Sequence, residues 1–307
     1  MSMKVCVTGG LGFIGVNLIR YLQDHTDWSL CVLDDYSSSV VDGLDDVEVF
    51  KGSVLDEKLL GKVLDDVDGV FHLAGNCGVI RSLDDPVFDM RENIWGTLNL
   101  LSVCKQCGVS RFVFSSSNAV LGMKNVSLVE DMTPVPVSPY GVSKLAAESY
   151  CRVLSSSDFR VRVCRLSNVY GPWSQKKTSV IPLFIKQILD DELVVVFGDG
   201  SQTRDFVFVD DVCQGLFRSF VHDGGVDFEL FQIGSGQCYS INYLLSLLKK
   251  DVGKNFEVVY KSFRRGEVRD SVSCIGKAGS LLGYDPLVGF DCGVEKTVWS
   301  FLDRRCG

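Results

Sequence analysis

Short apolar runs alternate with longer amphipathic stretches through the first half of the chain. The runs typical of strands are Lys4–Thr8, Ser29–Leu33, Val47–Lys51, Gly69–Leu73, Arg111–Ser115 and Arg160–Leu166. Apolar residues recur at helical spacing in Phe13–Gln23, Asp56–Leu64, Asp89–Cys107 and Tyr140–Leu154. This alternation predicts an α/β fold with a doubly wound parallel sheet, covered by helices on both faces.

The pattern becomes less regular after Gly171-Pro172. It predicts helices at Ile181–Leu189 and Asp211–Val221, a strand at Leu193–Phe197 and an extended segment at Phe206–Val209. We expect a larger domain of residues 1–170 with a returning segment at about 206–235, and a smaller mixed α/β lobe of residues 171–205 and 236–307. A ligand is expected in the cleft between them.

Charge and cysteine content narrow the classes of partner. The formal net charge of −8 makes nucleic acid an improbable partner, because phosphate backbones repel such a surface. No apolar run approaches the roughly 20 residues of a membrane-spanning helix. Several cysteines fall inside apolar runs, which suits a reducing cytoplasm. Cys104 and Cys107 have the spacing of a metal pair, but no companion ligands accompany them, so we expect no metal site.

A glycine-rich turn follows the first strand and opens the first helix. Within Thr8–Gly15 it contains Gly10-x-Gly12-x-x-Gly15, and Gly9 precedes them. Such glycines let the backbone approach a pyrophosphate at the positive end of a helix. The context of strand, turn and helix predicts dinucleotide binding by a Rossmann-type domain.

Acidic residues end the second strand, and they indicate which dinucleotide binds. Asp34 lies nineteen residues after Gly15, where a carboxylate accepts hydrogen bonds from the adenosine ribose. It would repel a 2′-phosphate, so NAD is preferred to NADP. Asp35 follows Asp34 directly, so one of these two residues is expected to serve only the turn after the strand.

Tyr140 and Lys144 are four residues apart at a predicted helix start, after Ser138-Pro139. An ammonium group beside a phenol, together with a positive nicotinamide ring, would lower the tyrosine pKa towards neutrality. Ser115–Ser117 end a strand at the sheet edge where such folds bind ligands. One of these hydroxyls could bind a reacting oxygen.

These motifs together resemble the extended short-chain dehydrogenase/reductase family, and its nucleotide-sugar 4-epimerases in particular. The segments that carry the resemblance are Thr8–Gly15, Phe71–Gly75, Asn93–Thr97, Ser115–Gly122, Tyr140 with Lys144, Arg165–Pro172, Gly198–Phe206 and Arg264–Glu267. They occur in the family's order along nearly the whole chain. The resemblance implies a homodimer formed through Asp89–Cys107 and Tyr140–Leu154.

The resemblance also implies a role for each site residue. Tyr140 would deprotonate the sugar 4-hydroxyl, Lys144 would bind the nicotinamide ribose, and Ser117 would bind the reacting oxygen. Cofactor contacts would come from Gly9, Gly12, Phe13, Ile14, Gly15, Asp34, Val54, Leu73, Ala74, Gly75, Tyr140 and Lys144. Substrate contacts would come from Ser117, Asn168, Arg204, Arg264 and Ser271, the arginines neutralising a diphosphate.

Departures from the family pattern select among reactions. Asn118-Ala119 stands where the 4,6-dehydratases carry Asp-Glu, and neither residue can accept a proton at neutral pH. Leu121 replaces a usual Tyr in one wall of the site. Ser271 is small where a bulky residue would exclude a 2-acetamido group.

The expected reaction is epimerisation at C4 of UDP-glucose/galactose or UDP-GlcNAc/GalNAc, with NAD as a bound catalyst and a transient 4-keto sugar. UDP-uronates are less favoured substrates. Two other hypotheses remain open at this point: a nucleotide-4-keto-sugar reductase, and a non-catalytic protein that binds NAD or a nucleotide sugar.

Overall fold

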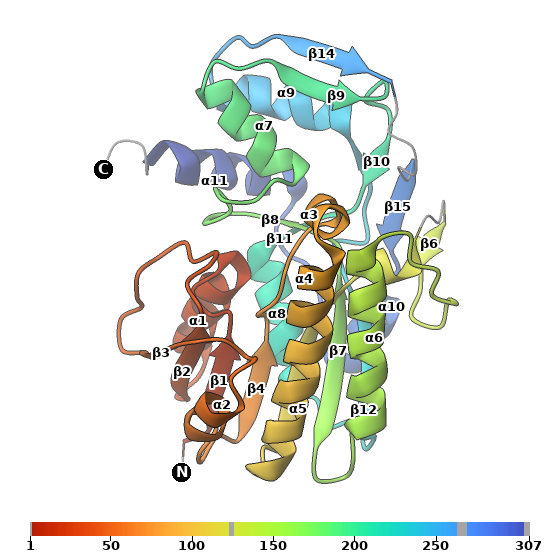
Figure 1. Ribbon diagram of the computed structural model, residues 1–307. Helices are drawn as coiled ribbons and strands as arrows, with labels where there is room; N and C mark the ends of the chain where they lie inside the picture. Colours follow the sequence, from red (N-terminus) through yellow and green to blue (C-terminus); the bar gives the residue numbers. More distant parts are fainter. Residues whose placement is uncertain (1, 123–125, 263–268, 304–307) are drawn as a thin grey trace.

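The computed structural model describes residues 2–122, 126–262 and 269–303. Its centre is a seven-stranded parallel sheet in the order β12-β7-β5-β4-β1-β2-β3 (Figure 1). The strands are β1 (Lys4–Thr8), β2 (Ser29–Asp34), β3 (Glu48–Lys51), β4 (Gly69–His72), β5 (Arg111–Ser117), β7 (Arg160–Leu166) and β12 (Phe228–Ile233). The predicted doubly wound α/β fold is confirmed.

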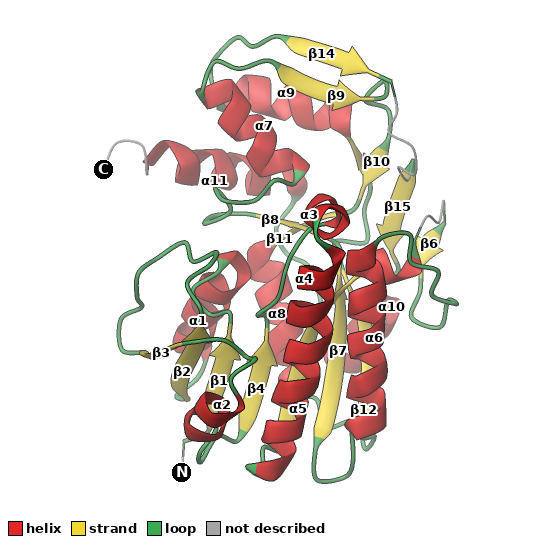
Figure 2. Cartoon of the chain, viewed as in Figure 1, coloured by secondary structure: helices red, strands yellow, loops and turns green. Residues whose placement is uncertain are grey.

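Helices cover both faces of this sheet (Figure 2). One face carries α2 (Glu57–Val63), α5 (Gly96–Gln106) and α6 (Pro139–Leu154). The other carries α1 (Phe13–His25), α8 (Val209–Val221) and α10 (Gly276–Leu282). Side chains alternate along each strand, so that Val5 and Val7 of β1 enter one core and Cys6 enters the other.

A smaller group of elements lies beyond the carboxyl ends of the sheet strands (Figure 1). It contains α7 (Val180–Leu189), α9 (Ile241–Asp251) and α11 (Phe290–Asp303), with β9 (Val194–Phe197) paired to β14 (Val258–Lys261). Short strands connect it to the sheet: β8 (Asn168–Tyr170) pairs with β11 (Phe206–Phe208), and β6 (Ser127–Leu128), β10 (Thr203–Arg204), β13 (Tyr239–Ser240) and β15 (Asp270–Ser273) form a second sheet. None of the described helices has the length and apolarity to cross a membrane.

The structure differs from the predicted elements in three places. The expected helix Asp89–Cys107 is divided into α4 (Pro86–Met90), a π-helical turn at Arg91–Trp95, and α5, with α3 (Val79–Asp84) before it. The helix α8 begins at Val209 rather than Asp211. The strand β12 is absent from the predicted set, because its sequence mixes Glu and Gln with apolar residues.

Candidate active site

The glycine turn leaves the start of α1 open to an anion. Gly9 has a φ of +71°, and a Cβ placed on it would lie 2.7 Å from the Ala74 backbone nitrogen. Gly12 is the N-cap of α1, and in the described part of the chain no side chain caps this helix start and no acidic residue occupies its first turn. The amide groups at Phe13 and Ile14 therefore suit a pyrophosphate, as the sequence predicts.

The two acidic residues after β2 have different environments. Asp34 is buried, and its Oδ2 accepts a hydrogen bond from the Leu11 amide at 3.0 Å. Its Oδ1 accepts bonds from the Tyr36 amide (2.8 Å) and the Ser39 hydroxyl (2.9 Å). Asp35 is exposed and only stabilises the turn that follows it. Asp34 is therefore held rigidly beside the glycine turn, where a ribose acceptor is required.

The remaining predicted cofactor residues lie at the carboxyl ends of β3 and β4. Val54 is buried after β3. The amide of Leu73 donates to Thr8 O (3.0 Å), and the amide of Ala74 donates to the Thr8 hydroxyl (3.4 Å). Gly75 has a φ of +150°, a conformation that few other residues adopt.

Local sequence explains how α6 presents Tyr140. Ser138 caps the helix by accepting a bond from the Gly141 amide (3.2 Å), and Pro139 occupies its first turn. The Tyr140 amide donates to the hydroxyl of Ser82, a buried residue of α3, at 3.1 Å. Sequence reasoning missed Ser82, because an isolated serine in a short helix carries no distinct signal.

Lys144 lies one turn after Tyr140 on the same helix face. Its Nζ lies 5.9 Å from the centre of the Tyr140 ring and donates to the backbone oxygen of Ser115 at 3.0 Å. Burial lowers the pKa of Lys144, while the nearby Cys77 and Asp89 oppose that change. The ammonium group is thus anchored between α6 and β5.

The environment of Tyr140 acts against ionisation of its hydroxyl. Burial raises the pKa of Tyr140 well above its ordinary value, and Cys77 raises it further, whereas a hydrogen bond from Ser117 lowers it. The expected lowering by Lys144 is therefore not produced by the protein groups alone. Burial is the largest of these effects on the Tyr140 pKa, and it outweighs the hydrogen bond from Ser117.

Each residue of the serine run has its own partner. Ser115 supplies its carbonyl oxygen to Lys144, and Ser116 donates from its buried hydroxyl to Glu148 Oε1 at 2.6 Å. Ser117 bonds to Tyr140 and also accepts a bond from the Ala119 amide (3.2 Å). Of the three serines, Ser117 is the one whose hydroxyl forms a hydrogen bond with Tyr140.

The residues predicted to bind the substrate lie together where the short strands β8, β10 and β15 adjoin the main sheet. Arg204 of β10 and Ser271 of β15 are register partners. Asn168 of β8 donates to Asp205 O at 3.0 Å, so it lies beside the same segment. Arg264 lies outside the described residues. Three of the four predicted residues from this region are therefore brought together.

A hydrogen-bonded network connects the end of β5 to the smaller group of elements beyond the sheet. The sequence did not predict this network. Asn118 donates to the hydroxyls of Ser167 (3.1 Å) and Ser273 (2.9 Å). Asp205 is fully buried and accepts bonds from the Ser273 amide (2.9 Å) and the Ser235 hydroxyl (2.7 Å). Burial raises the pKa of Asp205, and these donors oppose that change. The position of Asp205 directly after Arg204 is the sequence signal that could have identified it.

Leu121 does not line the site. It is fully buried in a small apolar cluster with Val120 and Leu128. The side chain therefore serves packing, and the expected effect of the missing Tyr on one wall of the site stays a prediction.

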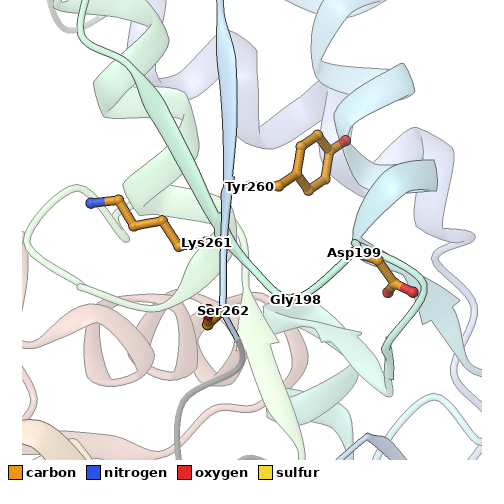
Figure 3. Close-up of a pocket in the computed structure, with 5 residues that line it drawn as sticks. All are labelled: Gly198, Asp199, Tyr260, Lys261 and Ser262. Atoms are coloured by element: carbon orange, nitrogen blue, oxygen red, sulfur yellow. The ribbon is translucent and has the colours of Figure 1, made fainter.

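An open pocket of about 380 Å³ lies where β9 and β14 end (Figure 3). It is lined by Gly198, Asp199, Tyr260, Lys261 and Ser262, and the Tyr260 and Lys261 side chains point to opposite sides of the strand. None of these is a predicted site residue, although Gly198 and Asp199 belong to the segment that leads to Arg204.

Comparison with known proteins identifies the family. Residues 5–234 match the model of the NAD dependent epimerase/dehydratase family. Among solved structures, the chain is similar to a UDP-glucose 4-epimerase of Thermotoga maritima with UDP-glucose (34% identity, TM-score 0.91, 99% of this chain and 100% of that chain). It is similar to a UDP-N-acetylglucosamine 4-epimerase of Methanobrevibacter ruminantium in complex with UDP-N-acetylmuramic acid (30%, 0.91, 99% and 99%). It is also similar to a UDP-glucuronic acid 4-epimerase of Bacillus cereus with UDP-glucuronic acid and NAD (30%, 0.90, 98% and 100%).

A glycine turn over an uncapped helix start, next to a paired Tyr and Lys, defines a dinucleotide-dependent enzyme of the Rossmann class. The chain belongs to the NAD dependent epimerase/dehydratase family. Its residues fit NAD, because the start of α1 accepts a pyrophosphate and Asp34 is placed for a ribose.

Proposed function

We propose that this protein is an NAD-dependent epimerase that inverts C4 of a UDP-sugar. The observation that carries the proposal is the arrangement of Tyr140, Ser117 and Lys144 at the carboxyl edge of the sheet, next to the glycine turn. All three solved relatives described above are named as nucleotide-sugar 4-epimerases. They favour this reaction over net reduction of a keto sugar and over binding alone.

Tyr140 is the proposed general base for the sugar 4-hydroxyl. Ser117 donates a hydrogen bond to the Tyr140 oxygen, and this bond stabilises the phenolate. The same Ser117 hydroxyl is proposed to hold the sugar 4-oxygen near Tyr140. Lys144 would contribute positive charge and hold the nicotinamide ribose. When bound, NAD supplies the chemistry that takes a hydride from C4 and returns it. Tyr140 then gives the proton back, so no protein group changes in a full cycle.

The smaller part, residues 171–205 and 236–307, is proposed to hold the UDP group, and residues 1–170 with about 206–235 to hold NAD. Arg204, Asn168 and Arg264 are proposed to grip the diphosphate, with Arg204 beside Ser271 supporting this arrangement. A diphosphate anchor lets the flat 4-keto sugar turn while it stays bound. Return of the hydride to the opposite face then inverts C4.

Asn118 and Ala119 favour simple epimerisation over dehydration. A dehydratase needs an acid and a base near C5 and C6 of the sugar. Here the Asn118 amide is engaged with Ser167 and Ser273, and Ala119 has no ionisable group. The relatives act on different sugars, so the sugar is proposed from Ser271, whose small side chain admits UDP-glucose/galactose and UDP-GlcNAc/GalNAc.

A cytoplasmic homodimer is the proposed state of the protein. The helices α4 and α5 lie end to end, with α6 beside them, on one face (Figure 1). Apolar side chains there reach solvent, including Val87 (69% exposed), Trp95 (65%) and Val153 (78%). A second copy would cover such a face.

The test is incubation of the purified protein with single UDP-sugars and no added cofactor, followed by proton NMR. The sugars are glucose, galactose, their N-acetylamino forms and glucuronate. A C4-inverted product without net reduction of cofactor supports the proposal and identifies the sugar. Failure of every sugar to react, even after NAD is supplied, would refute the assignment for these substrates.

A further inference from the structure

Buried polar side chains form a column along the helical segment from α4 to α5. Asp89, Asn93 and Thr97 are spaced four residues apart, so they lie on one face, and each is at most 1% exposed. The π-helical turn Arg91–Trp95 carries Asn93, and such turns often accompany functional sites. Thr97 contacts His72 at the lower end of the column, and α4 packs against α6 at the upper end.

Asp89 determines how two amide side chains are oriented. Its Oδ1 accepts hydrogen bonds from Asn76 Nδ2 (2.9 Å) and Asn93 Nδ2 (3.0 Å). A carboxylate offers these amides only acceptor atoms, so both must turn their NH₂ groups towards it. Asn93 Nδ2 also donates to Asn76 O at 3.1 Å, which supports the same orientation.

Both amide oxygens must consequently face away from the carboxylate. Asn76 Oδ1, Asn93 Oδ1 and Asp89 Oδ2 are buried acceptors without a hydrogen-bond partner among the described residues. A Cβ placed on Gly75 would lie 2.5 Å from Asn93 Oδ1 and 3.9 Å from Lys144 Nζ. The Asn93 oxygen and the ammonium group of Lys144 therefore flank the same glycine, and a ligand with donor groups on that side would satisfy the free oxygens.

The charge of Asp89 reaches the catalytic pair. It raises the pKa of Tyr140, in the same direction as the larger effects of burial and Cys77, and it raises the pKa of Lys144 against the larger, lowering effect of burial. The proposed function places the nicotinamide riboside beside Lys144. The nicotinamide ring is positively charged when oxidised and neutral when reduced, so a nearby negative charge distinguishes the two forms.

We propose that Asp89 is a positioning residue for the cofactor. It holds Asn76 and Asn93 with their oxygens towards donor groups of the nicotinamide riboside, and its charge favours the oxidised over the reduced ring. This inference rests on the proposed function. A preference for the oxidised ring favours the half-reaction in which the 4-keto sugar is reduced. It therefore shortens the time in which the 4-keto sugar could dissociate from the enzyme.

The experiment measures the relative affinity for the two cofactor forms. Purified holoenzyme is equilibrated by dialysis against several NAD to NADH ratios, and the bound ratio is read from NADH fluorescence. Asp89→Asn keeps the size of the side chain and an oxygen for the two amide bonds, but removes the charge. We expect its preference for NAD over NADH to fall about tenfold, the scale of effect that one nearby unit charge has in a protein-like dielectric.

Asp211→Asn is the matched control, because Asp211 is another buried aspartate, bonded to backbone amides of Leu287 and Val288. Its cofactor preference should equal that of the wild type. A wild-type ratio in folded Asp89→Asn would overturn the inference. If that variant does not fold, Asn93→Ala removes an amide oxygen that Asp89 orients, and it should bind NAD at least tenfold more weakly than the wild type; wild-type affinity for NAD in the folded Asn93→Ala protein would equally overturn the inference. Absence of cofactor binding by the wild type would refute the proposed function as well.

Discussion

Lys144 Nζ donates a hydrogen bond to the backbone oxygen of Ser115 at 3.0 Å, and this bond joins α6, which carries the proposed base Tyr140, to the strand that ends in Ser117. It sets the distance between the proposed base and the hydroxyl that assists it. The two groups come from α6 and β5, so their geometry depends on how these elements pack.

Tyr140→Phe is expected to abolish nearly all turnover while NAD binding remains. Removal of a general base costs about 10²- to 10⁴-fold in kcat, because phenylalanine cannot accept the proton of the sugar hydroxyl. Steady-state kinetics with the identified UDP-sugar checks the loss. Ser149→Ala, an exposed change on the same helix, is the control and keeps wild-type kcat. Substantial turnover by Tyr140→Phe would require another base.

Glu148→Gln is expected to lower the free energy of unfolding by about 3 to 5 kcal/mol, because it leaves Arg165 without its charged partner in the interior. The pair is about 95% buried, with Nη2 to Oε2 at 2.8 Å and Nε to Oε1 at 3.0 Å. Urea unfolding measures the loss. The double variant Glu148→Leu with Arg165→Met should lose less than the sum of its single changes. Strict additivity would contradict an interacting pair.

His72 makes stability depend on pH in the acid range. Burial lowers its pKa to about 3, and the ring lies between the hydroxyls of Thr8 (2.8 Å) and Thr97 (3.0 Å). The folded pKa lies below the unfolded value near 6.5, so the unfolded chain binds more protons between these values. Stability is therefore lost as pH falls through this window, by roughly 3 to 4 kcal/mol at pH 3.5.

The measurement compares wild type with His72→Gln in urea unfolding from pH 7 to pH 3.5. The difference in unfolding free energy between the two should move in favour of the variant as pH falls. A difference that stays constant across this range would show that His72 does not titrate on unfolding.

Ser271→Tyr is expected to narrow the substrate range. The residue is the register partner of Arg204, so a bulky side chain there would crowd the proposed sugar site. We expect the kcat/KM for UDP-GlcNAc to fall at least tenfold relative to that for UDP-glucose. Ser271→Ala is the control and should preserve the ratio of the two values. An equal loss for both sugars would place Ser271 away from the C2 substituent.

Paired substitutions on the α4–α6 face test the homodimer. Trp95→Asp combined with Val153→Asp should convert the protein to a monomer, because charged groups would be buried at the interface. Light scattering after size-exclusion chromatography gives the mass. Trp299→Asp, on α11, has a similar exposure of 64% and should leave the mass unchanged. A wild-type monomer would refute the proposed state.

Local patterns in the sequence account for most of the sheet and for the cofactor edge. The bounds of β1 and β7 agree with the predicted strands, because each is a buried run between clear turn residues. The glycine turn and the start of α6 are recognisable because Gly, Ser and Pro act within a few residues of themselves.

Long-range relationships were not accessible in the same way. The Asp89–Asn76 bond joins the loop after β4 to α4 across 13 residues, and the Asn118–Ser273 bond spans 155. The π-helical turn that places Asn93 has no signature in side-chain periodicity. Tertiary packing also determines the pKa of Tyr140, which local spacing with Lys144 predicted to be low.

The fate of the hydrogen at C4 tests the central claim most directly. The UDP-sugar is deuterated at C4 and converted by the protein in ordinary water, and the product is analysed by NMR and mass spectrometry. The account predicts that the C4-inverted product retains its deuterium at C4 and gains no solvent hydrogen on carbon. Loss of the label to solvent, or exchange at C5, would contradict oxidation and return at C4.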